Sequence, residues 1–95
     1  MNEAKKVFNE ISEIPKIVSH TELVSYPKDV DFYTPTKVMP LAQKILKNND
    51  FVSIISSKTH SIYYKFIGGE LYLFDLCNDY NFYFNFFKTI KLSDI

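Results

Sequence analysis

The fold is decided by residues 62–76, which read IYYKFIGGELYLFDL. Two adjacent glycines, Gly68 and Gly69, separate two runs rich in aromatic and branched residues that favour strands. A two-residue hairpin turn needs positive φ at both central positions, and glycine adopts that conformation at little cost. The stretch therefore predicts a β-hairpin that turns at these two glycines.

The glycine turn also sets the register of the hairpin, because directly opposed residues share a face of the sheet. Ile67 then faces Glu70, and Tyr64 faces Leu73. One face carries an apolar set that we expect two helices to cover: Ile62, Tyr64, Phe66, Leu71 and Leu73. The other face, which we expect to be open, carries Tyr63, Lys65, Ile67, Glu70, Tyr72, Phe74 and Leu76.

Residues 82–92 are predicted to form a further strand with the same two-sided character. Its alternation sends Phe82, Phe84 and Phe86 into the core, so that Tyr83 and Phe87 extend the open aromatic stripe. An aromatic patch of this size on a soluble domain usually marks an interface. The sequence leaves open whether residues 14–35, a second copy of the chain or another partner covers it.

Two amphipathic helices are predicted upstream, over residues 2–13 and 36–48. Both segments place apolar residues at the i, i+3, i+4 and i+7 spacing of a single buried stripe. Pro15 ends the first helix, and Pro40 has to lie in the first turn of the second. Asn48-Asn49 is the expected left-handed stop.

The stretch between the helices is ambiguous. Ile17-Val18 and Leu23-Val24 are candidates for short strands, or residues 19–22 cap a short helix. Residues 26–29 resemble a turn, and residues 31–35 a loop. With a strand over residues 51–56, the whole chain predicts one α+β domain, residues 1–95, with two helices on one face of a roughly four-stranded antiparallel meander.

Composition and charge narrow the classes of function. Eleven basic residues, all Lys, are balanced by 11 acidic residues, so the net charge is zero. Nucleic-acid binders normally carry a basic surface and use Arg, so this class is disfavoured. The single Cys excludes an internal disulfide, and no signal peptide or membrane span is recognisable. We expect a cytoplasmic protein without a membrane partner, from an AT-rich bacterial or phage genome.

Few residues are candidates for chemistry. His20, His60 and Cys77 do not have the spacing of zinc ligands, so no metal or cofactor is predicted. The hairpin register brings His60 and Cys77 together at its open end, where Asp75 or Asp79 completes a possible Cys-His-Asp site. No further catalytic motif accompanies these residues, and we do not expect an enzyme.

These observations favour a small intracellular protein-binding module. Inhibitors, immunity proteins, antitoxins and phage regulators of this size act by steric occlusion, and a homodimer is also compatible. The predicted contact residues are Tyr63, Lys65, Glu70, Tyr72, Phe74, Tyr83 and Phe87. One alternative is single-stranded nucleic-acid binding by the same aromatic face. A second is a small thiol-dependent enzyme.

Overall fold

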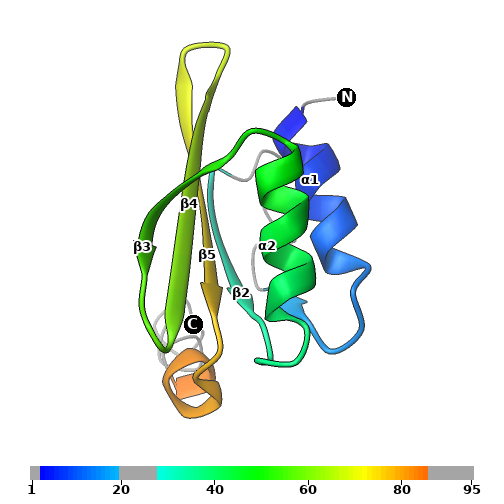
Figure 1. Cartoon of the computed structure of the whole chain (residues 1–95), viewed down its shortest axis with the longest axis vertical. Coiled ribbons are helices and arrows are strands. Elements are labelled where there is room, and N and C mark those ends of the chain that lie inside the picture. The colour runs from blue at the N-terminus through cyan, green and yellow to red at the C-terminus, as the bar shows by residue number, and fades with distance from the viewer. Residues whose placement is uncertain (1–2, 20–27, 86–95) are drawn as a thin grey trace, which may run out of the picture.

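The computed structural model describes residues 3–19 and 28–85. Its elements are α1 (Glu3–Ser12), β1 (Val18–Ser19), β2 (Asp29–Tyr33), α2 (Met39–Asn48), β3 (Val52–Ser56), β4 (His60–Ile67) and β5 (Glu70–Cys77). The strands form one sheet in the order β1-β2-β5-β4-β3, and both helices lie against one face of it (Figure 1). The predicted α+β fold with two helices on one face is confirmed.

The β4–β5 hairpin forms as predicted. Gly68 and Gly69 have φ values of 59° and 81°, which is the left-handed conformation that the turn requires. The pairs run from Ile67 opposite Glu70 down to His60 opposite Cys77, without a register shift. The turn chemistry alone therefore predicts which residues of β4 and β5 meet.

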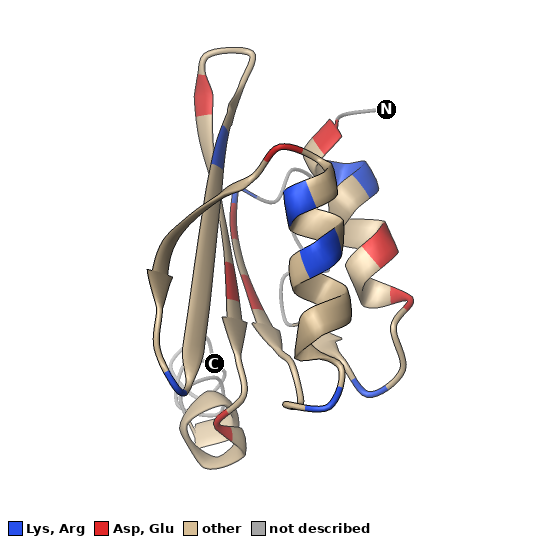
Figure 2. Ribbon diagram, viewed as in Figure 1, with Lys and Arg blue, Asp and Glu red and all other residues tan. Residues whose placement is uncertain are grey.

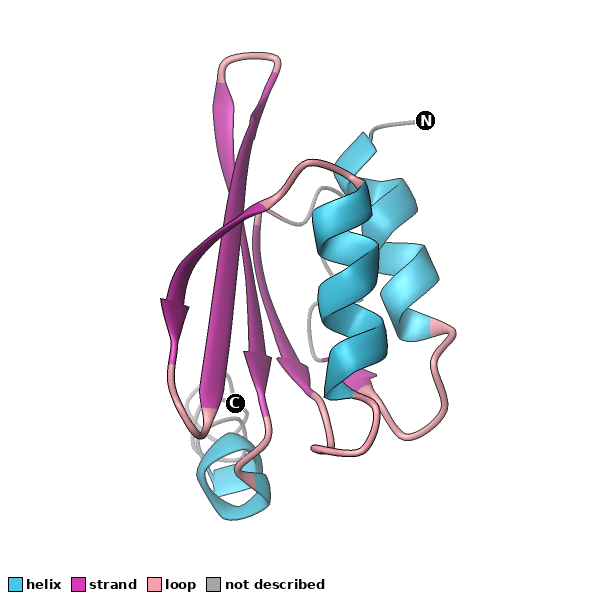
Figure 3. Ribbon diagram, viewed as in Figure 1, coloured by secondary structure: helices cyan, strands magenta, loops and turns pink. Residues whose placement is uncertain are grey.

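The sheet is mixed and five-stranded, whereas the sequence suggested an antiparallel meander of four strands. Residues 29–33, expected to be turn and loop, form β2, which pairs parallel with β5 and antiparallel with β1. Val30 and Phe32 are fully buried on the helix side, and the alternating Asp29 and Asp31 face the other way. A parallel pair needs a long crossover, and the chain from β2 to β5 supplies it through α2, β3 and β4 (Figure 3).

The helices end where local backbone chemistry stops them. Pro40 lies in the first turn of α2, as predicted, where its missing N–H breaks no helical hydrogen bond. The left-handed residue after α2 is Asp50, at φ 66°, and the expectation of Asn48-Asn49 is wrong by one position. Asn49 instead donates its side-chain amide to the Ile45 carbonyl at 2.8 Å, and the Phe51 N–H donates to the Leu46 carbonyl at 3.0 Å.

Aromatic rings form the centre of the core between helices and sheet. The ring of Phe32 lies 5.5 Å from that of Phe8 and 6.0 Å from that of Phe74. The ring of Phe51, just before β3, lies 5.0 Å from that of Phe74 and completes the aromatic cluster. These contacts join α1, β2, β5 and the α2–β3 connection, so the aromatic side chains hold the two layers together.

The helices cover the face of the hairpin that the sequence predicted to be open. Tyr63, Tyr72 and Phe74 are only 2%, 3% and 0% exposed, so their assignment to an open surface is wrong. Both faces of the hairpin carry apolar residues, and the choice between them is made by β2. Val30 of β2 is paired with Phe74 and is buried on the same side, which places the helices there.

The two charged residues expected at the rim of that surface have structural partners. Lys65 points to the helix side, where it contacts Glu3 of α1 and donates to the Asn49 carbonyl at 2.9 Å. Glu70, beside the hairpin turn, pairs with Lys28 at 3.0 Å. Lys65 therefore ties the sheet to α1 and to the end of α2.

Residues 80–85 are helical, so the prediction of a strand from residue 82 is wrong in the described part. Asp79 explains the difference: its side chain accepts the Phe82 N–H at 3.0 Å, as a helix N-cap does. Its carbonyl accepts the Tyr83 N–H at 3.0 Å. Tyr83 is buried at 2% exposure, and Phe87 lies outside the described residues.

Among the helices of the described residues, none is long and apolar enough to cross a membrane. Individual elements differ in charge (Figure 2). The charged residues of β2 and β5 are all acidic, and the charged residues of α2 are both lysines.

Candidate functional site

The face of the sheet opposite the helices, called the open face from here on, has an apolar half over β3, β4 and β5. Two rows of cross-strand pairs lie on this face of β3 and β4: Val52 is opposite Tyr64, and Ile55 is opposite Ile62. The hairpin continues these rows with Leu73 opposite Tyr64, and Phe66 opposite Leu71. The apolar half consists of Val52, Ile55, Ile62, Tyr64, Phe66, Leu71 and Leu73.

The second half of the open face is acidic. On the far side of the hairpin, β2 pairs with β5, and on this face Asp29 lies opposite Leu73 and Asp31 lies opposite Asp75. Strand β2 therefore adds two carboxylates to the one that β5 supplies. The acidic residues of both strands are drawn in red in Figure 2.

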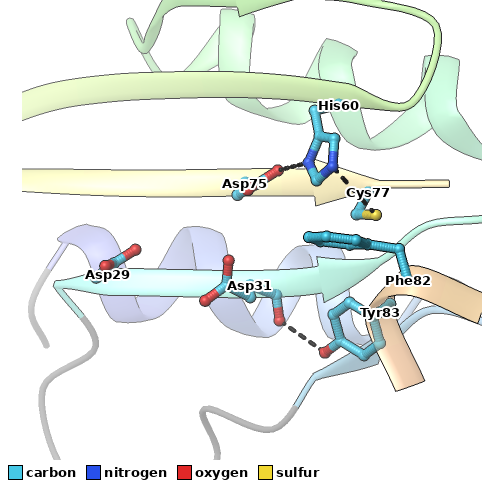
Figure 4. A pocket seen from close by; sticks show the side chains of 7 residues that line it. All are labelled: Asp29, Asp31, His60, Asp75, Cys77, Phe82 and Tyr83. Atoms are coloured by element: carbon cyan, nitrogen blue, oxygen red, sulfur yellow. Dashed lines mark hydrogen bonds and ion pairs between the residues drawn. The ribbon is translucent and has the colours of Figure 1, made fainter. Parts of the chain in front are cut away.

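A pocket of about 340 Å³ opens where the acidic half reaches the ends of β4 and β5. Figure 4 shows side chains from β2, β4, β5 and the segment 80–85 around it. Its lining residues are Asp29, Asp31, His60, Asp75, Cys77, Phe82 and Tyr83. This volume suits a small molecule or a single side chain.

His60 links Asp75 and Cys77 within the pocket. Its Nδ1 is 3.1 Å from Asp75 Oδ1, and its Nε2 is 3.8 Å from Cys77 Sγ. A carboxylate accepts hydrogen bonds, so it favours the tautomer in which Nδ1 carries the proton and Nε2 has a free lone pair. The arrangement is the Cys-His-Asp order that the hairpin register predicted, with Asp75 as the acid.

The turn between β3 and β4 holds His60 in place. The Ser57 N–H donates to the His60 carbonyl at 2.8 Å, and the His60 N–H donates to Ser57 Oγ at 3.1 Å. On the other strand, the Thr34 N–H donates to the Cys77 carbonyl at 2.6 Å. The backbone on both sides of the His60–Cys77 contact is therefore fixed by the sheet and its turns.

Burial and like charge shift two titrating groups of the pocket. Burial raises the pKa of Asp31 to about 6, with the carboxylates of Asp29 and Asp75 adding to the effect and His60 opposing it. Burial also raises the pKa of the Cys77 thiol, and nearby carboxylates add to that shift. A hydrogen bond from Sγ to the Asp79 carbonyl works in the opposite direction. The thiol therefore keeps its proton at neutral pH.

Aromatic side chains of segment 80–85 close one wall of the pocket. The Phe82 ring stands edge-on to His60 at 5.4 Å. Tyr83 donates its hydroxyl to the carbonyls of Asp31 and Val18, at 3.0 Å and 3.3 Å. Tyr80 and Phe84 pack on Tyr33 at 5.5 Å and 5.4 Å, which anchors the segment to β2.

The predicted contact residues do not gather at one surface. Tyr63, Tyr72 and Phe74 lie in the core, and Tyr83 lies in the pocket wall, so only the pair His60 and Cys77 meets as expected. Asp29 and Asp31 also line the pocket, and neither was predicted from the sequence to do so. Their signal was present in the alternation of residues 29–33, DVDFY, which has the period of a half-buried strand.

Among residues 3–19 and 28–85, no group of three or more His, Cys, Asp or Glu side chains is arranged to hold a metal ion. Asp29, Asp31, Asp75 and His60 all line the pocket. Comparison of the chain with protein-family models, curated proteins and solved structures gave no significant match.

Proposed function

We propose that this chain is a small protein-binding module that contacts its partner with the apolar half of the open face. One observation carries the proposal. Val52, Ile55, Phe66 and Leu71 are 52%, 50%, 63% and 43% exposed, although they share one face of one sheet. Contiguous apolar surface of this kind on a small domain is typical of a protein interface.

The free edge of β3 supports the same reading. Strand β3 ends the sheet, and no other described strand pairs with its outer edge. Its sequence, VSIIS, contains none of the Lys or Pro residues that usually protect an edge strand. A partner strand could therefore add to the sheet through main-chain hydrogen bonds and pack its side chains on the apolar half.

The mechanism we propose is steric occlusion, as in small inhibitors. The apolar half borders Asp29, Asp31 and Asp75, so the best-fitting partner has an apolar patch flanked by basic side chains. The same carboxylates repel phosphates, and three of the aromatics expected to stack bases, Tyr63, Tyr72 and Phe74, lie in the core. We therefore propose a protein-binding module whose contact surface is the open face of the hairpin, opposite the face predicted from the sequence.

A photo-crosslinking amino acid at Phe66, compared with one at Leu41, tests the proposal in the native cell. Leu41 is a matched control because it is a 54% exposed apolar residue on α2, in the helix layer. We expect a discrete crosslinked protein from position 66, absent from position 41 and lost when Val52→Asp is added. Equal products from both positions would contradict the proposal. A product made only of two copies of this chain would assign the surface to a homodimer and contradict the inhibitory role.

A further inference from the structure

The open face carries a second feature that the protein-binding surface does not use. Cys77, His60 and Asp75 lie outside the apolar half, at the pocket end of β4 and β5 (Figure 4). All three are strand residues, and the sheet register fixes their separation. Side chains held by strands in this way need little rearrangement to act together.

We propose that this pocket is an acyl-transfer site in which Cys77 is the nucleophile, His60 its general base, and the substrate a small ester that carries a positive charge. Cys77 and His60 are the catalytic residues, because they meet the reacting atoms. Asp75 is a positioning residue: it accepts a hydrogen bond from His60 Nδ1–H at 3.1 Å, which leaves Nε2 free to accept the thiol proton. This site does not depend on the proposed function.

The Cys77 thiol is protonated at rest, so its proton has to be removed as the sulfur attacks. Sγ attacks the ester carbonyl carbon, and the Sγ proton passes to His60 Nε2, 3.8 Å away in the resting structure. The intermediate then collapses as the ester C–O bond breaks, and the alcohol leaves with the proton from Nε2. Water attacks the resulting thioester by the same route, which releases the acid and returns the proton to Cys77. No oxidant or reductant takes part.

The pocket lining selects the charge of the substrate. Three carboxylates line the pocket, from Asp29 and Asp31 on β2 and Asp75 on β5, and the described lining includes no lysine. A cation on the acyl chain is stabilised there by these carboxylates and by the face of an aromatic ring such as Phe82. The volume of about 340 Å³ limits the substrate to a small molecule.

The test uses the whole chain and two esters of p-nitrophenol. One is the ester of trimethylammoniobutanoic acid, and the other is its neutral analogue in which carbon replaces nitrogen. We expect a burst of p-nitrophenol, an acyl adduct at Cys77 by mass spectrometry, and a preference for the cationic ester on the order of tenfold that falls as salt is added. Cys77→Ala should abolish the adduct, and His60→Gln should slow its formation by about 100-fold.

Two further variants separate positioning and charge from folding. Asp75→Asn should lower kcat for acylation and leave KM nearly unchanged, because His60 loses the carboxylate that accepts its Nδ1–H and holds the ring in place. Asp29→Asn should reduce the preference for the cationic ester, whereas Glu13→Gln, an exposed acid outside the pocket, should not. Circular dichroism checks that each variant is folded.

Two outcomes would overturn the inference. The first is that the folded protein forms no adduct while the urea-unfolded protein does, which shows a thiol that is shielded in the folded state. The second is that folded His60→Gln is acylated as fast as the parent. Neither outcome bears on crosslinking at Phe66, so the two proposals fail separately.

Discussion

His60 and Cys77 lie directly opposite each other at the open end of the β4–β5 hairpin, with Nε2 3.8 Å from Sγ. Their contact is decided at the far end of the same hairpin, because Gly68 and Gly69 set the register from which every pair follows. A slip of one residue would turn one of the two side chains to the helix side of the sheet. The His60–Cys77 contact in the pocket therefore depends on the register that the glycine turn sets.

Replacing either turn glycine by alanine should destabilise the protein by about 1 kcal/mol. The cost is backbone strain, since φ is 59° at Gly68 and 81° at Gly69. A new Cβ at either position meets no atom within 4 Å, so steric clash adds nothing. The measurement is the free energy of unfolding in urea. Gly69→Asn is the control and should lose less, because asparagine tolerates this conformation; equal losses for the two substitutions would contradict a strain effect.

The covered and open faces of the hairpin can be distinguished with one pair of substitutions. Phe74→Ala should lower the free energy of unfolding by about 3–5 kcal/mol, because it leaves a cavity in the core. Phe66→Ala should cost about 0.5 kcal/mol or less, since its side chain is 63% exposed. Urea denaturation measures both. Similar losses at the two positions would show that the helices do not cover the face carrying Phe74.

The parts of the fold that local chemistry decides could be predicted from the sequence. Gly68-Gly69, the helical stripes and Pro40 act within a few residues, and the hairpin and both helices followed from them. Which face of the hairpin is covered depends on β2, about 40 residues upstream of its partner β5 in the chain. No local pattern encodes that pairing, and both faces of the hairpin are apolar enough to be buried.

The same distinction between local and non-local contacts decides which parts of the pocket could be predicted from the sequence. His60 and Cys77 share the hairpin, so their contact followed from its register. Asp31 reaches the pocket only through the parallel pairing of β2 with β5, which is non-local. The alternation of Phe and Tyr residues predicts a strand at Tyr83, whereas the structure has a helix there that Asp79 caps. A single aspartate ahead of an aromatic run is a weak signal for such a cap.

The Tyr83 hydroxyl should contribute measurably to stability. It donates to the carbonyls of Asp31 and Val18, and Tyr83→Phe leaves these acceptors without that donor. We expect a loss of about 1 kcal/mol in the free energy of unfolding. Tyr80→Phe is the matched control, because Tyr80 is 60% exposed and contacts Tyr33 and Phe84 with its ring. A loss in the control as large as in Tyr83→Phe would rule out a specific role for the Tyr83 hydroxyl.

Asp31 should make the protein less stable as the pH rises toward neutrality. Its pKa is about 6 in the folded chain, against the ordinary value of 3.8 for an aspartate carboxyl. Between these values the folded state holds a proton that the unfolded state has lost, so the free energy of unfolding falls as the pH rises through this window. Above about pH 6 the ionised Asp31 is fully destabilising, and below about pH 4 the effect is absent.

Asp31→Asn removes this titration while keeping the size of the side chain. The variant should therefore gain stability over the parent at about pH 7, and the gain should shrink toward zero near pH 4. Urea denaturation at a series of pH values measures the difference. Glu13→Gln, which removes one exposed carboxylate outside the pocket, controls for the change in net charge. A gain that is the same at both ends of the pH range would mean that Asp31 is not the group whose ionisation the fold opposes.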